Sequence, residues 1–350
     1  MTLFLVHSLY HIFYALSIAE RNNLTNVVII CATSNGDKFI KIFDSIRIKY
    51  PYKIMNIKHN DTASKLSDVD LETLDLFKKQ TINELIIFNQ DNMMAVYLGK
   101  FFHRKNCKVS LAQDGLKAYA PIKRNALKYK FERSIMYYNF IKSNGFEYSR
   151  FFVNLKYASY SFIDNLYLSH PHACLESNKS KIEVNLSSII LDKFSDLLFN
   201  NKIDFNKETI FFASSLLKFN VMQIEIEIKI LTKLANQFNC YQKILKVHPR
   251  VSNKVYNELQ KIEGWIIIKD NFPGELLINS LKSTALVFSG YSSIALFKPR
   301  KELGTIYYWL YPLYGTSIKA LSWLQINKPS EDIILINSFN QLVELRKSIK

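Results

Sequence analysis

The chain has 350 residues, 48% of them hydrophobic and 22% charged, which is typical of a globular protein and long enough for two domains. Lys and Arg number 46 against 30 Asp and Glu, so the formal net charge is +16. This excess favours an anionic partner, such as nucleic acid, a membrane surface or an acidic glycan. The four cysteines lie far apart without CxxC spacing, which argues against a disulfide framework and a zinc site.

The first residues lack the basic start and small-residue cleavage site of a signal peptide. No stretch reaches the ~18 continuous apolar residues of a spanning helix. We therefore expect a soluble, cytoplasmic protein. Its basic surface would allow peripheral contact with the inner face of an anionic membrane.

The first half of the chain alternates short apolar runs with helical patterns, which is typical of βαβ units. A helix is predicted over Leu9–Arg21 from its apolar spacing. Strands are predicted over Leu3–Val6, Val27–Cys31, Lys53–Ile57, Glu84–Phe88 and Lys108–Ala112. Residues 119–168 are aromatic and basic with little strand character, so we interpret them as helices. The polar segment 176–185 is expected to be the crossover between domains.

A second alternating series follows. Helices are predicted over Val221–Asn236 and Phe339–Ile349. Strands are predicted over Thr209–Ala213, Lys243–Val247, Trp265–Ile268, Ala285–Phe288, Gly304–Tyr308 and Asp332–Ile336. The pattern predicts two doubly wound α/β domains, residues 1–180 and 181–350, that face each other. Ligands of such sheets bind beyond the carboxyl ends of the strands. No GxGxxG, Walker loop or HExxH occurs, which disfavours dinucleotide oxidoreductases, P-loop enzymes and zincins.

An acidic turn follows the predicted strand Lys108–Ala112, where the sequence reads Gln113-Asp114-Gly115. A carboxylate at such a strand end can point into a cleft and take a proton, and the glycine permits a sharp turn. An ordinary Asp-Gly turn is the alternative.

His248, Pro249 and Arg250 follow the predicted strand Lys243–Val247. A histidine there can donate to a phosphate oxygen or protonate a leaving group, and the proline restricts its loop. A structural histidine is the alternative. Further along, the carboxylate of Glu275 could accept from ribose hydroxyls, or it could be a first-turn charge favoured by the helix dipole.

Two small polar loops end other strands of the second half. One carries Ser214 and Ser215, and the other carries Gly290, Ser292 and Ser293. Hydroxyls and free backbone N–H groups at a helix start form a phosphate site. A plain serine N-cap is the alternative.

The order of these motifs resembles that of bacterial sialyltransferases, whose motifs are D/E-D/E-G, H-P and a Ser-Ser or Ser-Thr pair. The opening run Leu5–His11 also resembles the first strand and loop of the bacterial polysialyltransferase and lipooligosaccharide sialyltransferase group. The resemblance implies a GT-B fold, in which two Rossmann-like domains face a cleft. Residues 1–180 would then be the acceptor side and residues 181–350 the CMP-donor-binding side.

The resemblance also implies roles for individual residues. Asp114 would be the general base on the acceptor hydroxyl, and His248 would interact with the donor phosphate and help its departure. Ser292 and Ser293 would hold that phosphate, and Glu275 the ribose. Further donor-binding candidates are Pro249, Ser214, Ser215 and Gly290, and further cleft candidates are His7, Ser8, Gly115 and Arg250.

One departure from the family pattern is Gln113, which replaces the first acid of the D/E-D/E-G motif and bears on the pKa of Asp114. The implied activity is inverting transfer of sialic acid, or a related nonulosonic acid, from a CMP-sugar co-substrate to a bacterial surface glycan. Capsule, O-antigen and lipooligosaccharide or lipopolysaccharide are candidate acceptors, and their lipid-linked forms would suit a basic, membrane-facing surface. No cofactor and no metal are expected, since His and Ser donors can neutralise the phosphate.

Three alternatives stay open at this point. The first is a GT-B transferase with another donor, such as CMP-Kdo or a UDP-sugar. The second is a basic nucleic-acid-binding protein, against which no RRM, KH, OB or helix-turn-helix signature appears, so we expect no nucleic-acid partner. The third is a catalytically inactive member of the fold. A second His-Pro pair, His170-Pro171, is interpreted as structural.

Overall fold

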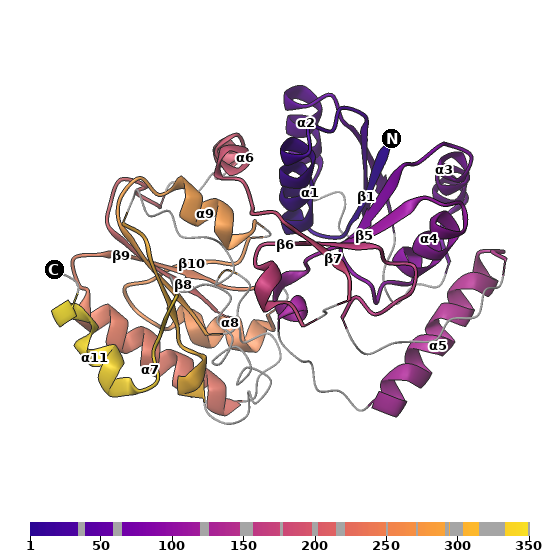
Figure 1. The fold of residues 1–350 in the computed structure, drawn as a ribbon. Helices are drawn as coiled ribbons and strands as arrows, with labels where there is room; N and C mark the ends of the chain where they lie inside the picture. The colour runs from indigo at the N-terminus through magenta and orange to yellow at the C-terminus, as the bar shows by residue number, and fades with distance from the viewer. Residues whose placement is uncertain are drawn as a thin grey trace. The chain divides into compact units, whose positions relative to one another are not determined.

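The computed structural model describes residues 1–33, 39–58, 65–119, 126–147, 157–175, 178–197, 202–214, 221–249, 251–270, 272–290, 294, 304–314 and 333–348. The chain divides into two compact units, Met1–Ser187 and Ser188–Lys350. Each unit is built on its own parallel sheet (Figure 1). The division falls after Ser187, whereas the sequence pattern placed it after residue 180.

The N-terminal unit holds a 7-stranded parallel sheet in the order β3-β2-β1-β4-β5-β6-β7. Its strands are β1 (Thr2–Val6), β2 (Val27–Ala32), β3 (Lys53–Ile57), β4 (Glu84–Ile87), β5 (Lys108–Ala112), β6 (Asn165–Leu168) and β7 (Ser180–Glu183). Its helices are α1 (Leu9–Arg21), α2 (Ile40–Lys49), α3 (Asp68–Lys78), α4 (Met93–Arg104) and α5 (Ala126–Ser143), with 3₁₀ turns η2 (Gly115–Ala118) and η3 (Pro171–Ala173). All residues of β1 and β2 are buried, as in a parallel sheet covered on both faces.

The C-terminal unit holds a 6-stranded parallel sheet in the order β10-β9-β8-β11-β12-β13. Its strands are β8 (Thr209–Ala213), β9 (Gln242–Lys246), β10 (Ile266–Ile268), β11 (Ala285–Ser289), β12 (Ile306–Trp309) and β13 (Ile333–Leu335). Its helices are α6 (Ser188–Asp192), α7 (Val221–Gln237), α8 (Asn253–Gln260), α9 (Gly274–Ser280) and α11 (Phe339–Ser348), with 3₁₀ turns η4 (Ser195–Leu197) and η8 (Tyr311–Tyr314). Its core includes Ile230, Leu231 and Leu234 of α7 packed with Phe212 and Phe288 of the sheet.

Both sheets reverse their strand order at one point, between β1 and β4 in the first and between β8 and β11 in the second. Ligands of doubly wound sheets bind beyond the carboxyl ends of the strands at this switch point. His7 and Ser8 follow β1, Ser214 follows β8 and Gly290 follows β11. Four of the predicted site residues therefore lie at a switch point.

The predicted architecture of two parallel-sheet α/β units is confirmed, but two local predictions are wrong. Residues 119–168 include β6, which is buried along its whole length although it contains Asn165 and Tyr167. The amide of Asn165 donates to Ser110 Oγ (3.3 Å), so this polar group tolerates burial. The segment 176–185 contributes β7, an edge strand whose outer positions face solvent and therefore lack an apolar run.

Candidate active site

Asp114 lies just beyond the carboxyl end of β5, and its side chain is 26% exposed. Gly115 follows with φ +60°, a left-handed conformation that favours glycine, and begins η2. The backbone of this turn therefore favours a glycine after Asp114, whatever the role of the carboxylate. It leaves the carboxylate at the sheet edge where ligands of this architecture bind.

The two oxygens of Asp114 have different partners. His11 Nε2 lies 3.1 Å from Oδ1, and Lys117 Nζ donates to Oδ2 over 2.6 Å. His11 is buried on α1, and its ring stacks on Phe88 with the centroids 4.6 Å apart. Because Lys117 belongs to the turn that Gly115 begins, one short segment supplies both the acid and its counter-charge.

The loop after β1 sets the orientation of the His11 ring. The backbone N–H of His7 donates to His11 Nδ1 (3.2 Å), so this nitrogen acts as an acceptor. The proton of the neutral ring is thereby assigned to Nε2, which donates to Asp114. Ser8 Oγ accepts from the backbone N–H of His11 (3.2 Å) as the N-cap of α1. His7 Nδ1 lies 2.8 Å from the carbonyl oxygen of Ala32.

Opposing effects act on the pKa of Asp114. Burial alone would raise it, but the Lys117 ammonium and the hydrogen bond from His11 hold it well below its usual range. Asp114 is therefore a carboxylate throughout the neutral pH range. It can accept a proton or a hydrogen bond and cannot donate one.

Gln113 is buried, and both its side-chain nitrogen and its side-chain oxygen form hydrogen bonds. Its Nε2 donates to Tyr10 Oη (2.7 Å), and its Oε1 accepts from Tyr119 Oη (2.6 Å) and from the backbone N–H of Ser169 (2.9 Å). The backbone N–H of His170 also donates to Tyr119 Oη (3.3 Å). The residue that replaces the first acid of the motif thus joins the ends of β5 and β6.

In the C-terminal unit, Ser214 donates to the carboxylate of Glu227 on α7, a glutamate that is fully buried. Tyr314 Oη donates to the other carboxylate oxygen (2.8 Å). Burial raises the pKa of Glu227 to about 7, although both hydrogen bonds oppose the shift. A Cβ at Gly290 would lie 2.8 Å from Tyr314 Oη, so the loops after β8 and β11 share one buried polar cluster.

His248 and Pro249 follow β9, and the imidazole of His248 is exposed. The preceding Lys246 is buried, and its Nζ donates to the carbonyl oxygen of Asp270 (2.6 Å). Glu275 is buried in the first turn of α9, and burial raises its pKa to about 7 against the positive charge of Lys246. Burial lowers the pKa of Lys246 to about 8. At neutral pH Lys246 therefore remains mostly protonated, and its charge acts on Glu275, the predicted ribose ligand.

The structure describes only part of the predicted set. Ser215, Arg250, Ser292 and Ser293 lie outside the described residues. Sequence reasoning missed the partners His11, Lys117, Glu227 and Tyr314. The burial of Glu227 could have been predicted from its spacing. It lies three residues after Ile224 and four before Leu231, so it falls on the buried stripe of α7.

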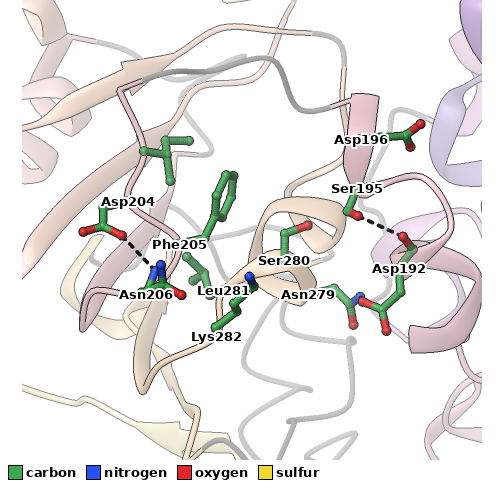
Figure 2. Close-up of a pocket in the computed structure, with 11 residues that line it drawn as sticks. Asp192, Ser195, Asp196, Asp204, Phe205, Asn206, Asn279, Ser280, Leu281 and Lys282 are labelled. Carbon is green, nitrogen blue, oxygen red and sulfur yellow. Dashed lines mark hydrogen bonds between the residues drawn. The ribbon is translucent and has the colours of Figure 1, made fainter.

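A cavity of about 640 Å³ lies elsewhere in the C-terminal unit (Figure 2). Its wall includes Phe205, Asn206 and Lys282, which precede β8 and β11, so it faces the amino ends of the strands. Its other charged residues are Asp192, Asp196 and Asp204. An acidic cavity at this edge is unsuited to a nucleotide phosphate. Among the described residues, no group of three or more His, Cys, Asp or Glu is placed to hold a metal ion.

Solved structures share this fold. The chain is similar to the 2,6-sialyltransferase of Photobacterium sp. JT-ISH-224, solved with CMP and lactose (TM-score 0.54, 12% identity, 95% of this chain and 78% of that chain). It is also similar to the UDP-GlcNAc 2-epimerase of Methanocaldococcus jannaschii (TM-score 0.52, 12% identity, 100% of this chain and 92% of that chain). No curated protein sequence matches the chain. The fold is that of a GT-B glycosyltransferase.

The family follows from the sequence model that matches. Residues 2–300 match the model described as Alpha-2,8-polysialyltransferase (POLYST). The chain belongs to this family, and the predicted resemblance to bacterial sialyltransferases is confirmed. The protein is a glycosyltransferase of the sialyltransferase class. Within the described residues, none of the helices has the length and apolar character needed to cross a membrane.

Proposed function

We propose that the chain transfers sialic acid, or a related nonulosonic acid, from a CMP-sugar to a hydroxyl of a bacterial surface glycan, with inversion at the anomeric carbon. Membership of the polysialyltransferase family supports the sugar. The similar Photobacterium structure, which contains CMP and lactose, supports a CMP donor and a glycan acceptor. One observation carries the proposal. An ionised carboxylate, Asp114, has both oxygens fixed by His11 and Lys117 at the carboxyl end of β5.

Asp114 acts as the general base in this proposal. The acceptor oxygen bonds to the anomeric carbon while the bond from that carbon to the CMP phosphate oxygen breaks, and the acceptor proton passes to Asp114. A carboxylate of low pKa takes this proton late, when the oxygen bonded to the cationic carbon has become acidic. Each carboxylate oxygen retains a second lone-pair site besides the one that His11 or Lys117 occupies, so the acceptor hydroxyl can bind.

The C-terminal unit binds the nucleotide in this proposal. The exposed imidazole of His248 donates to the departing phosphate, and Glu275 accepts from the ribose, as the family motifs imply. Ser214 and Gly290 directly follow β8 and β11, the two strands at the switch point, and begin the loops that come after these strands. Donors of this kind can offset the phosphate charge without a metal ion.

The acceptor is proposed from the family description. An α-2,8-polysialyltransferase would use a sialic acid residue as acceptor, so a sialylated oligosaccharide is the first acceptor to test. Its natural form would be a capsule, O-antigen or lipooligosaccharide chain, including lipid-linked intermediates. The excess of 46 Lys and Arg over 30 Asp and Glu suits such an anionic polymer.

Nucleotide-dependent melting tests the donor class. We expect CMP, and neither UDP nor GDP, to raise the melting midpoint, because a ligand that binds only the folded state stabilises it. His248→Ala should reduce this rise, whereas His103→Ala, an exposed histidine of the N-terminal unit, should leave it unchanged. Stabilisation by UDP alone would overturn the CMP assignment. Binding of an arbitrary oligonucleotide with steep salt dependence, without any nucleotide effect, would favour the nucleic-acid alternative.

A further inference from the structure

Helix α5 has one face that packs against the N-terminal unit. Tyr137, Phe140 and Ile141 are buried, and the ring of Phe140 lies 6.4 Å from that of Tyr97 on α4 (centroid to centroid). Arg133 Nη1 donates to the carbonyl oxygen of Asp91 (3.1 Å). Figure 1 shows α5 beyond α4, at the margin of this unit. These contacts hold α5 against the N-terminal unit.

The same helix carries a second apolar face, which is exposed. Leu127 is 82% exposed, Phe131 68%, Ile135 43% and Tyr138 50%. Their spacing of four, four and three residues places them on one side of an α-helix. An ordinary surface helix has one apolar stripe facing the core. A second, contiguous exposed stripe is typical of an interaction surface.

Basic residues accompany the exposed stripe. The helix sequence contains Lys128, Lys130, Arg133 and Lys142, and its only acidic residue is Glu132. Lys128 and Lys142 are exposed and lie seven residues before and after Ile135, so they share the side of the helix that carries the stripe. The surface therefore combines apolar and aromatic side chains with lysines, which suits the boundary between lipid headgroups and acyl chains.

We propose that α5 docks the protein on an anionic membrane. Leu127, Phe131, Ile135 and Tyr138 enter the headgroup region, while the flanking lysines meet lipid phosphates. Charge complementarity selects this occupant, because Lys128, Lys130 and Lys142 of the helix are exposed, the one carboxylate, Glu132, lies 3.9 Å from Lys128, and the chain has a formal charge of +16. The proposal is independent of the donor sugar and of the roles of Asp114 and His248.

Sedimentation of the full chain with vesicles tests this docking. We expect binding to phosphatidylcholine vesicles that contain phosphatidylglycerol and little binding to phosphatidylcholine alone. Phe131→Ser with Ile135→Ser should lower the partition coefficient about tenfold, because less apolar area enters the bilayer. The matched control is Val69→Ser with Leu76→Ser, which removes exposed apolar side chains from α3 and should leave binding unchanged.

Two further measurements keep the test decisive. Lys128→Gln with Lys142→Gln should weaken binding at low salt and matter less at high salt, since the attraction is screened. The melting midpoint of every variant should match the wild type, because the changed residues are exposed. Equal vesicle binding by wild type and the Phe131/Ile135 variant would overturn the proposal. The proposal would also be overturned if the wild type did not bind anionic vesicles but formed a dimer, and the Phe131/Ile135 variant did not form that dimer. CMP-dependent melting, which does not involve α5, would report separately on the proposed transferase function.

Discussion

Replacing the buried Glu227 by glutamine is expected to change how the stability of the C-terminal unit depends on pH. Burial raises the pKa of this group from 4.5 to about 7, so the folded state holds the proton more tightly than the unfolded chain. The contribution of Glu227 to the free energy of unfolding is complete below about pH 4.5 and is lost as the pH rises through about 7. At 1.36 kcal/mol for each pKa unit, the loss is ~3 kcal/mol.

Glutamine resembles the protonated carboxyl group. Its oxygen can accept from Ser214, and its amide can donate to Tyr314 Oη, so both contacts of Glu227 have a counterpart. The Glu227→Gln variant should therefore lack this loss. Between about pH 5 and about pH 8, the unfolding free energy of the variant should gain ~3 kcal/mol relative to the wild type. Glu275 contributes a similar decline to both proteins and cancels in the difference.

Denaturant unfolding followed by tryptophan fluorescence measures this difference in one unit. The three tryptophans, Trp265, Trp309 and Trp323, all belong to the C-terminal unit. Glu225→Gln is the matched control, because this glutamate is exposed on the same helix and the variant should follow the wild type. Parallel pH curves for Glu227→Gln and wild type would refute the reasoning, since they would mean that the folded state does not hold the proton more tightly.

Two other substitutions test the sites directly. Lys117→Met removes the ammonium that lowers the pKa of Asp114, so the acidic limb of the pH–rate profile should move to higher pH. An unmoved limb would show that another group titrates there. Gly290→Ala places a Cβ 2.8 Å from Tyr314 Oη and should destabilise the C-terminal unit by about 1–3 kcal/mol, measured by tryptophan fluorescence. Unchanged stability would mean that the loop shifts without strain.

Most of the fold could be predicted because buried parallel strands have a strong sequence signal. The five residues of β1 and of β8 are apolar or small and wholly buried, and both strands were predicted within one residue. β6 and β7 were missed because Asn165 and Tyr167 interrupt one run and solvent faces the other. Their assignment depends on the pairing of β6 with β5 and of β7 with β6, which a local pattern does not reveal.

The site was predictable in part for the same reason. Asp114 and His248 could be proposed as site residues because each comes two residues after the carboxyl end of a strand, β5 in one sheet and β9 in the other, where ligands of parallel sheets bind. Their partners could not, because the contact between Asp114 and His11 joins residues 103 positions apart. Glu227 follows the helical period of its buried neighbours, but the period does not indicate that a carboxyl group can be accommodated there. Ser214 and Tyr314 supply the hydrogen bonds that make this burial tolerable.

The rate of sialic acid transfer by wild type and Asp114→Asn tests the central claim most directly. With CMP-sialic acid and an α-2,8-sialylated oligosaccharide, the wild type should release CMP and lengthen the acceptor. Asp114→Asn should lose about 10²–10⁴-fold in rate while keeping the rise in melting midpoint that CMP causes. Asp44→Asn, an exposed carboxylate on α2, should behave as the wild type. Full transfer by Asp114→Asn would contradict the account, because the proton would then pass to another group.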